Sequence, residues 1–233
     1  MTKPSSVRAL TLDLDETLWP IAPVIERAEA ALHVWLAQNA PATAARFDVA
    51  ALRELRDTVA LEFPDRAHDF TWARKVSIER ALVAAGDDAA WAEPAFEHFF
   101  EWRHRVTLFP DALPALTRLA ARFPLLALTN GNAELHRMGL AHFFVGRLSA
   151  RDHGRGKPHA DFFQAGCERL GVSPGQALHV GDDAALDIEG AHAAGQPSAW
   201  IVRPHHGMPP APLHAKPVFV GADLLQLADW LGA

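Results

Sequence analysis

Short apolar runs and amphipathic segments alternate at the start of the chain and through its second half. Apolar runs without the polar alternation of a half-exposed strand predict buried parallel strands at 7–14, 124–129, 177–180 and 198–202. Weaker strands are expected at 143–148 and 218–220, helices at 111–122, 132–140, 160–170, 184–194 and 223–231, and a loop rich in Pro and His at 204–217. This alternation predicts an α/β fold of three layers, with helices on both faces of a parallel sheet.

A different pattern occupies the stretch between the first two strands. Helical spacing recurs there without a convincing strand, at 23–38, 48–61, 70–85 and 88–106. An insertion of this length is too long for a plain loop. We therefore expect two domains, an α/β core formed by 1–19 and 107–233 and an all-α helical-bundle cap formed by 20–106.

Composition and charge argue against several classes of function. Apolar residues make up 49% of the chain and charged residues 21%, which is ordinary for a globular protein. The net charge of -6 argues against a nucleic-acid partner, because binding to phosphate backbones requires a basic face. There is no apolar run of membrane-spanning length, no secretory signal, and only one cysteine, Cys167. We expect a cytoplasmic monomer whose partner is a small molecule.

Polar residues gather at or beyond the ends of the expected strands. The four groups are DLDET at 13–17, TNGN at 129–132, GKP at 156–158, and GDD at 181–183 with Asp187 beyond it. Ligands of open parallel sheets bind beyond the carboxyl ends of the strands. The four groups can therefore converge on one site at that edge of the sheet.

Convergence would bring the carboxylates of Asp13, Asp15 and Asp182 into one cleft. Such crowding is unfavourable unless protons or a cation compensate the charge. Oxygen ligands favour Mg²⁺, which retains waters and commonly binds a substrate phosphate. The His and Cys spacing of a zinc site is absent. The sequence thus indicates a magnesium site.

The Asp13 and Asp15 pair suits the transfer of a phosphoryl group. Because the strand gives way to a loop there, the two carboxylates can differ in environment and in role. One can act as a nucleophile that forms an acyl phosphate, while the other protonates the leaving oxygen and then deprotonates water. Lys157, the Thr129 hydroxyl and the Asn130 backbone N–H can bind the phosphoryl oxygens.

The ordered set DLDET, LTNGN, GKP and GDD…D, with a helical insertion after its first member, resembles the haloacid-dehalogenase-like hydrolases. The resemblance covers the whole chain and implies a Rossmann-like core, a helical cap and Mg²⁺-dependent phosphatase activity. It further implies that Asp13 is the nucleophile and a metal ligand. Asp15 would be the acid and base, and would bind the metal through its backbone carbonyl.

The same resemblance implies roles for the other groups. Asp182 would bind the metal, and Thr129 and Lys157 would hold the phosphate. Asp187 would act behind the metal ligands, through a water or toward Lys157. Asp183 either takes part near the metal or caps the following helix.

Longer stretches resemble one branch of this family. PVIERAE, LTNGNAE, HGRGKPHADFF, LHVGDD and WIVRP are similar to bacterial phosphatases of riboflavin biosynthesis. That branch acts on 5-amino-6-(5-phosphoribitylamino)uracil intermediates and on flavin mononucleotide, so the resemblance implies a substrate of this kind. Glu16 departs from the Asp or Gly that is common after the second aspartate, but its side chain has no assigned catalytic role.

Other functions stay open on the sequence alone. A sugar-phosphate phosphatase or a phosphomutase would use the same scaffold. A 2-haloacid dehalogenase also uses an Asp nucleophile, but needs neither Mg²⁺ nor an acid at Asp15. A binding protein with a retired active site is disfavoured, because no key charge is missing.

In the expected cap, aromatic and basic residues cluster at 70–75. Arg74 is the best candidate there for contacting a substrate. Core packing and a solvated helix face account better for Phe70 and Lys75.

Overall fold

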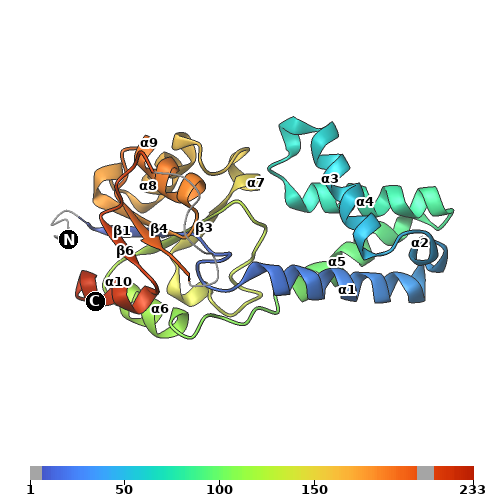
Figure 1. Ribbon diagram of the computed structural model, residues 1–233, viewed down its shortest axis with the longest axis horizontal. Coiled ribbons are helices and arrows are strands. Elements are labelled where there is room, and N and C mark those ends of the chain that lie inside the picture. The colour runs from blue at the N-terminus through green and yellow to red at the C-terminus, as the bar shows by residue number, and fades with distance from the viewer. Residues whose placement is uncertain (1–6, 204–212) are drawn as a thin grey trace. The chain divides into compact units, whose positions relative to one another are not determined.

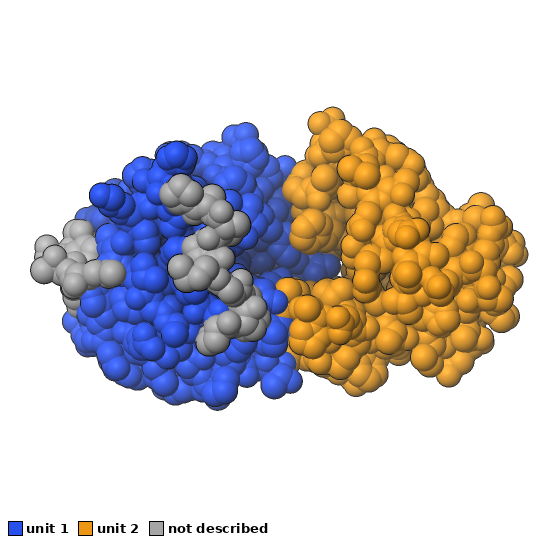
Figure 2. All heavy atoms as spheres, viewed as in Figure 1, with its two compact units in different colours: residues 1–20, 107–233 blue, residues 21–106 orange. Residues whose placement is uncertain are grey.

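The computed structural model describes residues 7–203 and 213–233, so most of the loop expected at 204–217 lies outside the described residues. The chain divides into two compact units, residues 1–20 with 107–233 and residues 21–106, which Figure 2 colours separately. Within the first unit, the Phe109 N–H donates to the Leu18 carbonyl oxygen at 2.9 Å. The chain therefore leaves and re-enters this unit at neighbouring points.

A six-stranded sheet is the centre of the first unit, and its paired strands are parallel (Figure 1). The strands are β1 (Ala9–Leu12), β2 (Leu125–Thr129), β3 (Gly146–Ser149), β4 (Ala177–Gly181), β5 (Ser198–Ile201) and β6 (Phe219–Gly221). Their order in the sheet is β3-β2-β1-β4-β5-β6. Because β1 lies between β2 and β4, the polar residues that follow these three strands meet at one edge.

Helices cover both faces of this sheet, with α6 and α10 on one side and α8 and α9 on the other (Figure 1). The elements are α6 (Ala112–Ala120), η3 (Ala141–Phe143), α7 (Ala150–His153), α8 (Ala160–Leu170), η4 (Pro174–Gln176), η5 (Ala184–Glu189), α9 (Gly190–Ala193) and α10 (Leu224–Leu231). Every residue of β1, β2 and β4 is buried, which explains their continuous apolar runs. The expected α/β class, a Rossmann-like core with a helical insertion, is confirmed.

The expectation of a helix at 132–140 was wrong, since the stretch holds only turns, at 135–139. Gly139 has a φ of 71°, and the Leu140 N–H donates to the Leu135 carbonyl oxygen at 2.9 Å. A left-handed glycine with such a bond is the usual end of a helix. Here it closes the turns before a helix can extend.

Two other boundaries also differ from expectation. The strand expected at 143–148 begins only at Gly146, because the 3₁₀ turn η3 includes Phe143. The helix expected at 184–194 is divided into the π-helix η5 and the short helix α9. At 184–194 the apolar spacing indicates a helix, but it does not distinguish the type of turn.

The described residues of the second unit form helices and turns, with no strand among them (Figure 1). The elements are α1 (Ile21–Asn39), α2 (Pro41–Arg46), α3 (Val49–Glu62), η1 (Pro64–Arg66), α4 (Phe70–Ala85), η2 (Ala89–Trp91) and α5 (Ala92–Arg103). The Asp48 and Asp69 carboxylates cap α3 and α4, and Gly86 ends α4 with a φ of 86°. None of the helices in the described ranges is long and apolar enough to cross a membrane.

A buried carboxylate connects the helices of the second unit. Glu29 of α1 is 3% exposed, and Arg74 Nη2 of α4 lies 3.0 Å from its Oε1. From α3, Arg53 Nη2 approaches Glu29 to 2.5 Å and Arg56 Nη1 to 3.4 Å. The Arg74 guanidinium also stacks 4.2 Å from the ring centre of Phe99 on α5. Glu29 of α1 thus pairs directly with side chains of α3 and α4, and Arg74 extends the contact to α5.

Arg74 itself is 5% exposed. Burial, together with the charge of Arg56, lowers the pKa of Arg74 to about 10, and the opposing attraction of Glu29 does not offset this. Glu29 is the ion-pair partner of Arg74 in this structure. A contact between Arg74 and a substrate stays a prediction.

Replacing Glu29 with Gln should destabilise the second unit by about 3 kcal/mol, because the buried Arg74 charge loses its carboxylate. Denaturant unfolding followed by circular dichroism measures this loss. The matched control is Glu93→Gln, since Glu93 is 62% exposed and pairs with Lys75 at the surface. Loss of an exposed pair costs about 1 kcal/mol or less. Equal losses in the two variants would contradict a structural role for the buried carboxylate.

Candidate active site

A buried ion pair lies at the carboxyl edge of the central strands. Lys157 Nζ lies 2.5 Å from Asp13 Oδ1 and 2.6 Å from Asp187 Oδ1. Asp13 follows β1, and its N–H donates to the Val180 carbonyl oxygen of β4. Lys157 and Asp13 are 6% and 7% exposed and Asp187 is fully buried. The GKP loop, the first strand and the GDD loop therefore meet here.

Asn130 fixes the backbone of Lys157. Its Oδ1 accepts a hydrogen bond from the Lys157 N–H at 2.7 Å, and its Nδ2 donates to the Lys157 carbonyl oxygen at 2.9 Å. A Cβ at Gly156 would lie 2.1 Å from Asn130 Oδ1, so only glycine permits this approach. The side chain of Asn130 thus positions Lys157, a role that the sequence did not suggest.

Thr129 ends β2 and is 1% exposed. Its Oγ1 accepts a hydrogen bond from the Gly131 N–H at 2.9 Å. A hydroxyl that accepts in this way keeps its own proton, which it can donate to a phosphoryl oxygen.

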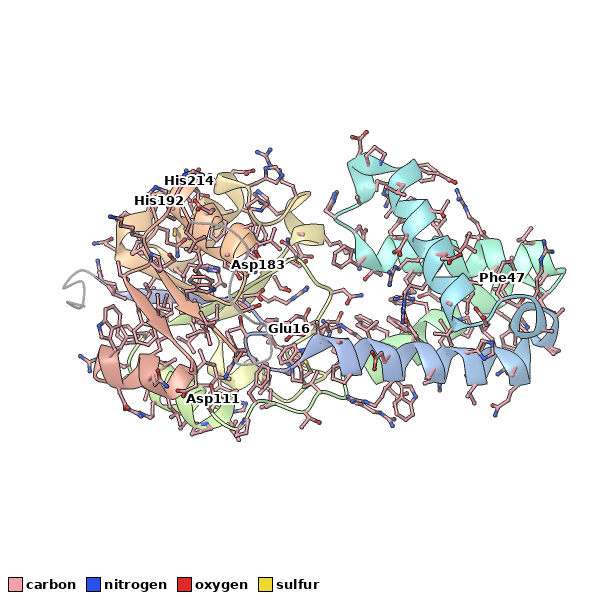
Figure 3. The ribbon with its side chains drawn as sticks, viewed as in Figure 1. Glu16, Phe47, Asp111, Asp183, His192 and His214 are labelled. Carbon is pink, nitrogen blue, oxygen red and sulfur yellow. The ribbon has the colours of Figure 1, made fainter. Side chains whose placement is uncertain are left out.

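The loop after β1 holds Asp15 and contacts Asp182. Trp19 Nε1 donates to Asp15 Oδ1 at 2.8 Å, and Thr17 Oγ1 donates to Asp182 Oδ1 at 2.9 Å. Glu16, labelled in Figure 3, has a φ of 62°. This left-handed conformation explains why a glycine is the easier residue at that position.

Two residues of the WIVRP stretch support Asp182 and the loop after β1. Trp200 Nε1 donates to the carbonyl oxygen of Asp182 at 2.8 Å. Arg203 Nη2 donates to the carbonyl oxygen of Thr17 at 2.5 Å, and its Nη1 to Asp111 Oδ1 at 2.7 Å. Sequence reasoning noted this stretch as a resemblance but missed its role, because its partners lie far away along the chain.

Asp187 and Asp183 have different environments. Asp187 Oδ1 accepts from Lys157 and, at 2.9 Å, from His179 Nε2, while its Oδ2 accepts from the Asp183 N–H at 3.0 Å. The Asp183 side chain, labelled in Figure 3, caps η5 by accepting from the N–H groups at 185 and 186. Asp187 is thus directed toward Lys157, and Asp183 toward the helix.

Burial and crowding shift the pKa values of these groups. Burial raises the pKa of Asp13 well above its usual range, with Asp187 and Asp182 adding to the effect. Burial likewise raises the pKa of Asp182 to about 7. Burial acts on Asp187 in the same sense, but the Lys157 charge and the bond from His179 prevail and lower its pKa. Burial disfavours charge on Lys157, yet Asp13 and Asp187 raise its pKa.

The carboxylates suit a hard divalent cation. Single oxygens of Asp13, Asp182 and Asp187 all lie within 4.8 Å of one another. Asp187 already accepts three hydrogen bonds, which leaves Asp13 and Asp182 as the better ligands. Burial raises the pKa of both carboxyl groups, and a bound cation would favour their ionised forms. Oxygen donors with excess negative charge fit Mg²⁺ or a similar cation.

Gly181→Ala should destabilise the first unit by about 2–3 kcal/mol, because a Cβ there would lie 2.2 Å from Asp187 Cγ and displace the carboxylate from its donors. The control is Gly175→Ala, where a Cβ meets nothing within 4 Å. Chemical denaturation of both variants, with tryptophan fluorescence as the signal, gives the comparison. If both variants were as stable as the parent chain, the close packing of Asp187 under β4 would be disproved.

The chain has extensive similarity to known proteins. The 5-amino-6-(5-phospho-D-ribitylamino)uracil phosphatase YigB of Escherichia coli (strain K12) is 38% identical over 86% of this chain and 85% of the relative. The phosphoserine phosphatase of Thermus thermophilus is 34% identical over 67% of this chain and 65% of that protein. Curated relatives that align with most of the chain thus include phosphatases.

A solved structure extends the similarity to the whole fold. The crystal structure of a 2-haloacid dehalogenase from Pseudomonas syringae pv. Tomato DC3000 superimposes with a TM-score of 0.88 at 37% identity, covering 97% of this chain and 98% of that one. The family model for haloacid dehalogenase-like hydrolases matches residues 7–195, a range that includes the whole second unit, most of the first and all four polar groups. This chain therefore belongs to the haloacid dehalogenase-like hydrolases and is an enzyme of that family.

Proposed function

We propose that this enzyme is a Mg²⁺-dependent phosphatase that hydrolyses the phosphate monoester of a small molecule through an aspartyl-phosphate on Asp13. The observation that carries the proposal is the buried contact of Lys157 with Asp13 and Asp187, beside Asp182. Such a group of charges suits a phosphoryl group and a divalent cation together.

The residues divide the chemistry between them. The Asp13 carboxylate attacks phosphorus, and the ester oxygen leaves with a proton from Asp15. Asp15 then takes a proton from water, which hydrolyses the acyl phosphate and restores Asp13. Lys157 and the Thr129 hydroxyl stabilise the phosphoryl oxygens during both steps. When bound to Asp13, Asp182 and the Asp15 carbonyl, Mg²⁺ would offset the negative charge of carboxylates and phosphate.

The proposed substrate is an intermediate of riboflavin biosynthesis of the 5-amino-6-(5-phosphoribitylamino)uracil type, or flavin mononucleotide. The 38% identity to the Escherichia coli enzyme over 86% of this chain supports it. In this proposal the second unit is the cap that governs access of the substrate. The cytoplasmic location and the monomeric state stay predictions.

A 2-haloacid dehalogenase is the second candidate, favoured by the similarity to the Pseudomonas syringae structure, with its TM-score of 0.88. Cleavage of a carbon–halogen bond requires no leaving-group acid and no cation. That reaction has no use for the hydrogen bond by which Trp19 holds the Asp15 carboxylate. It likewise has no use for the closely spaced carboxylate oxygens of Asp13 and Asp182. These features support the phosphatase.

The direct test is release of phosphate or halide by the purified enzyme. The substrates are the phosphoribitylamino-uracil compound, flavin mononucleotide, sugar phosphates including a mutase substrate, phosphoserine and 2-chloropropionate, each with Mg²⁺ and with chelator. We expect Mg²⁺-dependent phosphate release, fastest with the flavin-pathway compounds. Faster turnover of another ester would be consistent with the phosphatase mechanism but would reject the assignment to riboflavin biosynthesis. Halide release that persists in chelator would reject the phosphatase.

Asp15→Asn should lower kcat for phosphate release by about 10²–10⁴-fold, because the leaving oxygen loses its acid. A dehalogenase would keep its activity in this variant. Asp229→Asn is the control, since Asp229 is 70% exposed on α10. Steady-state phosphate release from the best ester measures the effect, and an Asp15→Asn enzyme as active as the control would remove Asp15 from the mechanism.

The stabilising effect of Mg²⁺ should grow with pH. The pKa of Asp182 is about 7 in the fold against 3.8 ordinarily, so the folded state holds a proton that the unfolded state has lost between these values. Stability of the metal-free enzyme therefore falls as pH rises through this window. A bound cation requires the ionised carboxylate. Scanning fluorimetry should show a small Mg²⁺-induced rise in Tm near pH 5.5 and a larger one near pH 8. A rise independent of pH would contradict this.

A further inference from the structure

A buried chain of side-chain hydrogen bonds runs from the active-site lysine along β4 and β1. Lys157 binds Asp187 Oδ1, which accepts from His179 Nε2 at 2.9 Å. His179 Nδ1 lies 2.9 Å from Thr11 Oγ1, and Gln196 Nε2 donates to that oxygen at 2.8 Å. Thr11 and His179 are register partners on β1 and β4, and both are fully buried. This hydrogen-bond chain begins at Lys157 and ends at Gln196, which contacts Cys167 of α8.

The chemistry of the groups gives these bonds a direction. Cys167 Sγ donates to Gln196 Oε1 at 3.7 Å, which directs the amide nitrogen of Gln196 toward Thr11. Burial raises the pKa of the Cys167 thiol to about 11, so it keeps the proton it donates. The Thr11 hydroxyl accepts from Gln196 and directs its own proton to Nδ1 of His179. The remaining ring proton then lies on Nε2.

The other end of the hydrogen-bond chain, at Asp187, leads to the same tautomer of His179. The Asp187 carboxylate has no proton to donate and faces Nε2, so a bare nitrogen there would be repelled. Burial lowers the pKa of His179, which disfavours a second ring proton. The edge of the ring also meets Phe163, with centroids 4.9 Å apart and planes at 88°, and this packing restricts its rotation. The Asp187 end of the hydrogen-bond chain therefore requires an N–H at Nε2, and the Thr11 end fits an acceptor at Nδ1.

We propose that His179 is a positioning residue for the reaction: its Nε2–H, oriented by Thr11 and Gln196, fixes Asp187 so that Lys157 is directed at Asp13. The role in catalysis rests on the proposed function. Asp187 Oδ1 receives Lys157 and His179, and its Oδ2 receives the Asp183 N–H, so three donors set the carboxylate plane. Without one of these donors the Asp187 carboxylate can rotate, and Lys157, which is bound to it, is then displaced as well.

Two substitutions of His179 separate positioning from packing. The amide nitrogen of Gln reaches the position of Nε2 and can donate to Asp187, whereas the Asn amide reaches only the position of Nδ1. We expect His179→Asn to lower kcat about 10–100-fold, the usual effect of losing a group that orients an active-site ligand. His179→Gln should retain most of kcat, with KM little changed in either variant. Equal kcat in the two variants, with equal losses of Tm, would reduce His179 to a packing role.

Nitrogen-15 NMR of the uniformly labelled wild-type enzyme reads the tautomer without any assay. The His179 signals are identified by their absence from His179→Gln. We expect the chemical shift of a protonated, pyrrole-type nitrogen at Nε2 and that of an unprotonated, pyridine-type nitrogen at Nδ1. In Thr11→Val, the Nδ1 chemical shift should change because its hydrogen bond is lost. A protonated Nδ1 would overturn the proposal, even in an active enzyme. If the wild-type enzyme released phosphate from none of the esters, the proposed function would be rejected instead. The two failures are distinguishable, because the NMR result does not depend on activity.

Discussion

The structure of the site depends on one buried cation, the ammonium group of Lys157 between Asp13 and Asp187. Charges removed from water are tolerated only when their partners are held close and in good geometry. The fold meets this requirement from several directions, since the side chain of Asn130 binds the lysine backbone on both sides. A glycine at 181 lets Asp187 pass under the end of β4. A parallel sheet is what brings these remote segments to a common edge.

The charges at this edge are not balanced within the protein. Asp187 has a lowered pKa because it takes the lysine and the histidine as donors, while Asp13 and Asp182 have raised ones. Asp187 accepts bonds from the lysine and the histidine, whereas burial disfavours the ionised forms of Asp13 and Asp182. In the proposed function, this difference accounts for the separate roles of the three aspartates, one in holding a lysine and two in receiving a cation.

Much of this could be predicted from sequence because it is local. Apolar runs identify the buried strands; DLDET, TNGN and GDD lie at their ends, and GKP lies in the loop before α8. The unforeseen parts depend on partners that are remote along the chain. His179 looks like one more residue of a buried strand until Thr11, 168 positions away, is found beside it. The role of Arg203 becomes visible only in the fold, where its side chain contacts the backbone of Thr17. The π-helical turns of η5 were not predicted, because their apolar spacing does not differ clearly from that of an α-helix.

The adjacency of Leu18 and Phe109 has an evolutionary consequence. Because the inserted segment begins and ends at neighbouring points, it can be lengthened, shortened or exchanged without changing the register of any strand. In the proposed function, selection can therefore act on the inserted helices separately from the strand ends that carry the chemistry. A lineage built on this scaffold would then diversify its choice of metabolite while it inherits the same reaction.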